Sequence, residues 1–160
     1  MTEEEILESL KVPFRFKRRP VAMPGDLRID WRIATLTLIL YHCRGKRASL
    51  KQLHVLNWSI RTTKTRATFS EILDGIRDPS LALVRFEPAL NRAVDFAIGE
   101  GLAERIDGTS VGLTNKGQAF AASLLEEDGC LVEERAFLRQ IKGKTTQKKI
   151  DELFAGGTNR

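Results

Sequence analysis

The sequence has few of the residues that catalytic and metal sites use. Among 160 residues there are two cysteines and two histidines, and Cys43 and Cys130 stand far apart with no Cys-x-x-Cys spacing. A structural zinc site needs four nitrogen or sulfur ligands at recognisable spacing, so we expect no metal. Free thiols are the default state of cysteine in the cytoplasm, and we expect the chain to be cytoplasmic.

Long apolar runs are also missing. The longest, Leu36–Tyr41, is interrupted by Thr37 and is far shorter than the ~20 residues of a membrane span. The acidic start, Glu3–Glu5, is unlike the basic start of a signal peptide. Hydrophobic residues make up 42% and charged residues 29%, which is typical of a globular domain. We expect one ordinary core, no membrane contact and no small-molecule substrate.

Patterns that carry catalysis are absent as well. Glu71, Asp74 and Asp78 share helical spacing, but no apolar residues surround them to raise a carboxyl pKa, which favours a solvated acidic face. Gly143-Lys144-Thr145 imitates the end of a phosphate-binding loop, yet Leu138, in a helical pattern, occupies the place of its first glycine. We therefore expect neither an enzyme nor a bound cofactor.

One zone of forty residues contains no acidic side chain. Residues 31–70 hold eight basic side chains and no Asp or Glu, whereas residues 71–130 carry a net charge of −6. This segregation predicts a positive face that attracts phosphates or an acidic partner. A solvated basic surface without a dedicated ligand is the alternative. The candidate nucleic-acid-binding residues, which would contact backbone oxygens without reading sequence, are Arg44, Lys46, Arg47, Lys51, Arg61, Lys64 and Arg66.

The stretch Phe86–Ala121 predicts a helix, a β-hairpin and a second helix. Pro88 suits the first turn of a helix, and apolar residues follow it at helical spacing. Asp107-Gly108 is typical of a tight turn between two alternating strands, and Thr114 can cap the final helix. A helix that leads into a two-stranded wing and another helix is the back half of a winged-helix domain.

The front half of that domain is predicted upstream. Residues 30–43 form a central apolar helix, and Ser49 caps a second helix over Leu50–Ile60. In a helix-turn-helix the next helix follows after a short turn, but here residues 61–85 intervene and include a helix over 67–76. The sequence thus predicts a mainly α fold with a small β-wing, a winged helix-turn-helix-like domain with an inserted helix.

Two parts flank this domain, which covers residues 30–129. Residues 1–29 form an N-terminal arm, where Thr2 and Glu5 make a capping box for a short helix and Phe14 and Phe16 share one side of an extended segment. Two such phenylalanines need a covering surface, either in this domain or on a partner. Residues 130–160 form a C-terminal helix and a tail that we expect to be mobile apart from one weak helical turn at 149–154.

The predicted helix over Glu87–Glu100 occupies the position that reads bases in DNA-binding winged helices. It offers Asn91 and Arg92 to bases, but its net charge of −2 repels phosphates. We therefore expect Glu87, Asn91, Arg92 and Asp95 to contact a protein partner, together with Phe14 and Phe16 of the arm.

Two levels of resemblance sharpen these expectations. Glu100–Gly117 resembles the wing of bacterial winged-helix regulators, in which Glu-Gly-Leu ends a helix and Leu-Thr-x-x-Gly follows the wing. Over residues 30–120, the segments LKQLHVLNWSIR (Leu50–Arg61) and VRFEPALNRAVDFAIGEGLAER (Val84–Arg105) look like the small middle component of bacterial three-component ABC-ATPase systems. These systems include Lamassu-type anti-phage and anti-plasmid defence.

The second resemblance implies a non-catalytic winged-helix adaptor. Such a subunit bridges an ATPase similar to structural-maintenance-of-chromosomes (SMC) proteins and an effector, often a nuclease. The basic face would help to hold DNA by phosphate contacts. A winged-helix transcriptional regulator, dimeric through its last helices, is the alternative that the wing and the terminal helices also fit.

Overall fold

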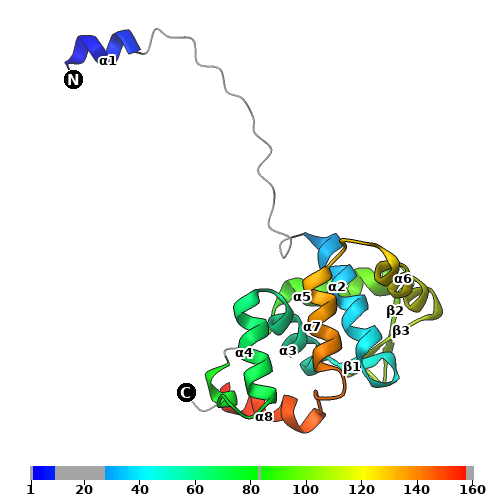
Figure 1. The fold of residues 1–160 in the computed structure, drawn as a ribbon. Coiled ribbons are helices and arrows are strands. Elements are labelled where there is room, and N and C mark those ends of the chain that lie inside the picture. The colour runs from blue at the N-terminus through cyan, green and yellow to red at the C-terminus, as the bar shows by residue number, and fades with distance from the viewer. Residues whose placement is uncertain (1, 10–27, 83, 158–160) are drawn as a thin grey trace.

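The computed structural model describes residues 2–9, 28–82 and 84–157 (Figure 1). Phe14 and Phe16 lie outside the described residues. The mainly α class with a small β-sheet, predicted from the sequence, is confirmed. In chain order the elements are α1 (Glu3–Ser9), α2 (Ile29–His42), η2 (Arg44–Lys46), β1 (Arg47–Ser49), α3 (Leu50–Ile60), α4 (Thr63–Leu73), η3 (Pro79–Leu81), α5 (Pro88–Gly99), β2 (Ala103–Ile106), β3 (Ser110–Leu113), α6 (Asn115–Glu126), α7 (Val132–Ile141) and α8 (Gln147–Gly157).

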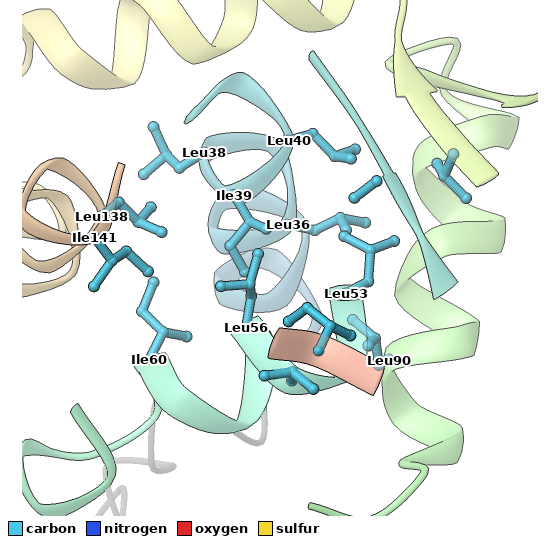
Figure 2. Close-up of a cluster of buried hydrophobic side chains, with 14 of the residues drawn as sticks. Leu36, Leu38, Ile39, Leu40, Leu53, Leu56, Ile60, Leu90, Leu138 and Ile141 are labelled. Atoms are coloured by element: carbon cyan, nitrogen blue, oxygen red, sulfur yellow. The ribbon is translucent and has the colours of Figure 1, made fainter. Parts of the chain in front are cut away.

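Helix α2 is the centre of the molecule, as its apolar sequence predicts. Its residues from Thr35 to Leu40 are all buried, and it packs against α3, α5, α6 and α7. Figure 2 shows side chains from α2, α3, α5 and α7 converging around Leu36 and Ile39. The hydroxyl of Thr37 donates to the Ile33 carbonyl at 2.7 Å, so this buried polar group keeps a partner inside the helix.

The three strands form one antiparallel sheet in the order β1-β3-β2. Strand β2 pairs Ile106 with Ser110 of β3, so residues 107–109 form the hairpin loop, and Asp107 and Gly108 both have positive φ (52° and 69°). The turn predicted from Asp-Gly is therefore confirmed. Strand β1 adds Ala48 opposite Val111, which ties the segment between α2 and α3 to the hairpin.

Helix α6 begins directly behind the hairpin. The Thr114 hydroxyl accepts the Gly117 N–H at 3.1 Å, so the predicted cap is confirmed. A Cβ on Gly117 would lie 1.9 Å from the Leu102 carbonyl oxygen. Only glycine therefore allows the first turn of α6 to approach the start of β2 this closely.

The segment between α3 and α5 contains a helix, but not with the expected bounds. Helix α4 begins at Thr63, four residues before the predicted start, because Thr62 and Thr65 form a reciprocal capping box. It ends at Leu73, and Gly75 (φ 74°) continues in the left-handed region. The buried Phe69 packs edge-to-face on Phe137 of α7, so the inserted helix belongs to the core.

The C-terminal region adds two helices to this core. Phe137, Leu138 and Ile141 of α7 are buried against α2, α3 and α4. Helix α8, at the bottom of Figure 1, spans eleven residues where the sequence predicts a single turn, and it buries Ile150 and Leu153 against α3 and η3. The division into an arm, a domain over 30–129 and a C-terminal part stays a prediction.

Candidate functional site

A basic groove lies at the C-terminal end of α2. Two adjoining pockets of about 750 and 480 Å3 share the lining residues Arg44, Gly45, Arg47, Gln52 and Gln147. Lys46 and Lys142 also line the larger pocket, and among the described residues no Asp or Glu lines either one. Side chains that donate hydrogen bonds and carry positive charge, with no carboxylate among them, suit a phosphate or another anion. We call this site, defined by Arg44, Lys46, Arg47, Gln52, Lys142 and Gln147, the basic groove.

A sharp turn between α2 and β1 brings three of these cations together. Gly45 and Lys46 have φ values of 66° and 53°, and the left-handed pair reverses the chain within η2. The Lys46 ammonium lies 3.6 Å from the centroid of the Tyr41 ring, a cation–π contact that fixes its position. Arg44 and Arg47 stay exposed on either side of it.

The positive charges of the groove affect the pKa of His42, which is one of its lining residues. Its Nδ1 donates to the Leu38 carbonyl at 2.8 Å, so Nδ1 carries the proton of the neutral ring. Burial lowers the pKa of His42 against the opposing effect of the hydrogen bond to Leu38, and the charges of Lys142 and Lys46 lower it further. The neighbouring Cys43 thiol has its pKa raised to about 11 by burial, so it stays protonated and is a poor nucleophile.

The structure brings three of the seven predicted nucleic-acid-binding residues together in the groove, and a fourth precedes the lining residue Gln52. Arg44, Lys46 and Arg47 line the groove, and Lys51 is exposed on the first turn of α3 beside it. The other three lie at the far end of α3 and on α4. Ten helical residues separate Lys51 from Arg61, which corresponds to a rise of about 15 Å. Those three are Arg61, Lys64 and Arg66.

At that far end two of the three cations form ion pairs with acidic residues of other elements. The Arg66 side chain is 12% exposed, pairs with Glu133 of α7 and donates to the Ile60 carbonyl at 2.8 Å. Arg61 lies 3.7 Å from Glu87. Lys64 remains exposed. The predicted basic zone thus has two parts, a solvent-facing groove at one end of α3 and a set of cations held in ion pairs at the other.

Sequence reasoning missed the contribution of the C-terminal region to the groove. Lys142, Thr145 and Gln147 line it, although they stand about a hundred residues after Arg44. Lys144, by contrast, faces Asp74 at 3.5 Å. The net charge of +3 over residues 131–160 was the available signal, but it does not indicate which cations meet the groove.

A second site lies at the N-terminal end of α2, where Glu87 joins three elements. Its carboxylate accepts from Arg32 Nη2 of α2 at 2.7 Å and from Asn57 Nδ2 of α3 at 2.8 Å. Burial alone would raise the pKa of Glu87, but the hydrogen bond from Arg32 and the charges of Arg61 and Arg32 together lower it. Glu87, predicted to contact a partner, therefore holds the start of α5 onto α2 and α3.

His54 supports the same junction. Its Nδ1 accepts the backbone N–H of Glu87 at 3.2 Å, so that nitrogen carries no proton. The ring is 2% exposed, and burial lowers its pKa, although Asn91 and Glu87 act in the opposite direction. Its role is structural, because a neutral imidazole satisfies an otherwise orphaned N–H before α5.

The remaining predicted partner residues lie on the exposed face of α5. Asn91 and Arg92 are exposed, and Asp95 pairs with Arg105 of β2 at 2.8 Å. Because Glu87 and Asp95 are each paired with an arginine from another element, the face is less negative than the helix's own net charge of −2. The electrostatic reason to exclude nucleic acid from α5 is correspondingly weaker.

This face has an apolar side as well. Phe96 and Ile29 are 56% and 43% exposed, and with Ala89, Arg32 and Arg92 they line a pocket of about 320 Å3. We call this the α2–α5 pocket. It lies at one end of α2 and the basic groove at the other.

Comparisons with known proteins give no relatives: no family model, curated protein or solved structure matches the chain. Within the described residues, no group of three or more His, Cys, Asp or Glu side chains is placed to hold a metal ion. None of the helices in this part of the chain has the length and apolar character of a membrane span.

Proposed function

We propose that the chain is a winged-helix protein with an inserted helix. The order α2–β1–α3–α5–β2–β3–α6, with α4 placed between α3 and α5, supports this proposal. So does the sheet order β1-β3-β2, in which the first short strand pairs with the return strand of the hairpin. The hairpin β2–β3 is then the wing, and α5 takes the place of the recognition helix.

Within that fold we propose a non-catalytic adaptor for an SMC-like ABC-ATPase in bacterial anti-phage or anti-plasmid defence. The observation that carries the proposal is the separation of two unlike surfaces along α2. A helix from Ile29 to His42 is about 20 Å long. The α2–α5 pocket, with its apolar wall, lies at its start, and the basic groove at its end. A bridging subunit needs two such surfaces, one for protein and one for DNA.

The basic groove is the proposed DNA contact. Its arginines and lysines suit phosphate oxygens, and such contacts fix the protein on the duplex without reading sequence. The ATPase is proposed to dock at the α2–α5 pocket, and a nuclease-type effector elsewhere on the chain. The resemblance of residues 30–120 to middle components names these partners.

One observation favours the alternative, a winged-helix transcriptional regulator. Asn91 and Arg92 are both exposed on α5, and these residue types read adenine and guanine edges in the major groove. A regulator would form a dimer and protect one operator from cleavage. An adaptor would instead retain any duplex of equal length.

Co-expression with the products of the neighbouring genes, followed by affinity purification, tests the adaptor proposal. We expect a stable complex with a large ATPase, and retention of duplex DNA that does not depend on sequence. A lone dimer that footprints its own promoter would contradict the adaptor and favour the regulator.

A further inference from the structure

We propose that the α2–α5 pocket binds a carboxylate from an acidic, apolar helical segment of the partner that docks there. The inference rests on the proposed adaptor function and names the chemistry of its protein-binding surface. It is carried by a buried arginine that has an unused donor, an unpaired arginine at the rim, and exposed apolar walls between them.

Arg32 is the deepest residue of the pocket. It is 5% exposed, and Glu87 takes a hydrogen bond from its Nη2, but its Nη1 has no partner among the described residues. A buried guanidinium N–H that lacks an acceptor costs free energy in the unbound chain. Arg32 lines the α2–α5 pocket, so a carboxylate bound there would bring an acceptor and a negative charge close to this guanidinium.

The charges around the pocket favour an anionic ligand. Glu87 is shared between Arg32 and Arg61, and Asp95 is paired with Arg105, so neither carboxylate neutralises Arg92. No carboxylate of the described residues forms an ion pair with Arg92, which is exposed at the pocket rim. The cluster therefore holds an excess of positive charge that a partner carboxylate can balance with paired hydrogen bonds.

The walls distinguish a peptide from a nucleic acid. Phe96 and Ile29 are largely exposed, and Ala89 lies beside them in the lining. Phosphates would leave these apolar surfaces in water, whereas a leucine or phenylalanine side chain would cover them. On a helix, an acidic residue and an apolar residue three or four positions apart present both groups on one face. The pocket therefore fits an acidic, amphipathic helix better than DNA.

A fluorescein-labelled, amphipathic helical peptide made of Glu and Leu is the probe, and anisotropy with the full chain is the measurement. We expect saturable binding that weakens at least tenfold in the exposed-site variant Arg92→Glu and again when every Glu of the peptide is replaced by Gln. Lys51→Glu is the matched control, because it makes the same charge change beside the basic groove, and it should leave the affinity within twofold.

Several results would overturn the proposal. Equal loss in Lys51→Glu and Arg92→Glu would mean that net charge alone attracts the peptide. Equal affinity for the Glu and Gln peptides would show that the pocket does not recognise a carboxylate. Displacement of the bound peptide by duplex DNA in the Lys51→Glu variant would assign the pocket to nucleic acid. A tenfold gain on deletion of residues 2–9 would make the chain's own acidic α1 segment the occupant.

The failure of this inference differs from the failure of the adaptor proposal. A complex with the ATPase that survives Arg92→Glu, while the peptide no longer binds, removes the pocket from the docking surface and leaves the adaptor in place. Specific peptide binding with no ATPase complex in any variant removes the adaptor and keeps the pocket.

Discussion

The two ends of α3 have similar basic sequences and opposite structural roles. Near Lys51, the cations of η2 and β1 face solvent around a groove without carboxylates. Near Arg61, the guanidinium groups of Arg61 and Arg66 meet Glu87 and Glu133. The acidic partners come from elements far along the chain, so a zone without a single carboxylate is neutralised at one end and left charged at the other.

The comparison shows that burial decides which cations are available to a ligand. The Arg66 side chain is 12% exposed and donates to the Ile60 carbonyl in the last turn of α3, whereas Arg44 of η2 and Arg47 of β1 are exposed. A charge reversal at Arg61 or Arg66 would break an ion pair of the fold as well as any DNA contact, so its effect on DNA binding would have two causes. Variants at the groove end avoid that ambiguity.

The largest effect is expected from Glu87→Ala, which acts where Arg61 ends α3. The substitution leaves the Arg32 guanidinium buried without its carboxylate, and such a loss costs about 3 kcal/mol of the free energy of unfolding. Urea unfolding measures it. Glu100→Ala, on an exposed residue at the other end of α5, is the control and should change stability by less than about 0.5 kcal/mol. A loss below about 1 kcal/mol for Glu87→Ala would show that the ion pair is dispensable.

Arg66→Ala should have the next largest effect. It removes the hydrogen bond to the Ile60 carbonyl and the pair with Glu133, and we expect the free energy of unfolding to fall by about 2 kcal/mol. Lys64→Ala, two residues away and exposed, should cost about 0.5 kcal/mol or less. Equal losses of stability in the two variants would show that the contacts of Arg66 contribute no more than those of the exposed Lys64.

Single charge reversals should separate the two ends by DNA binding. Lys51→Glu lies beside the groove and should weaken binding to a duplex roughly fivefold, because each phosphate contact contributes to the salt-dependent term. Lys64→Glu makes the same change on α4 and should weaken binding less than twofold. Fluorescence anisotropy at fixed salt gives both values. A larger loss of binding in Lys64→Glu than in Lys51→Glu would place the DNA contact at the α3–α4 end.

The smallest effect concerns pH. Burial lowers the pKa of both His54 and His42, so below the usual histidine pKa of about 6.5 the unfolded chain binds more protons than the folded one. The free energy of unfolding should therefore fall as pH decreases from 7 to 5.5. The slope of that decrease, measured by urea unfolding at several pH values, should be smaller in His54→Gln. An unchanged slope would mean that His54 titrates alike in both states.

Local signals allowed much of the fold to be predicted. Ser49 and Thr114 cap α3 and α6, and Asp107-Gly108 forms the hairpin turn, because each acts on backbone groups within a few residues. Helix α4 begins four residues before the predicted start, because Thr62 and Thr65 cap each other, and threonine is not the Glu or Gln usual at the second position of a capping box.

The long-range contacts could not be predicted in the same way. In the sequence Glu87 adds a negative charge to the start of α5. In the fold its carboxylate is paired with Arg32, fifty-five positions earlier. Lys142 and Gln147 reach the basic groove only because α7 and α8 pack on the core. Helix α8 is longer than the turn predicted at 149–154, and it packs its buried Ile150 and Leu153 on α3 and η3, which are distant in the sequence.

The salt dependence of duplex binding tests the central claim, that the basic groove is the DNA contact, most directly. The triple variant Arg44→Gln, Arg47→Gln, Lys51→Gln removes three exposed cations from the groove end. We expect the slope of log affinity against log salt to become shallower by about 2 to 3, since each lost phosphate contact contributes roughly 0.9. A slope equal to that of the unaltered chain would show that DNA does not bind at the groove.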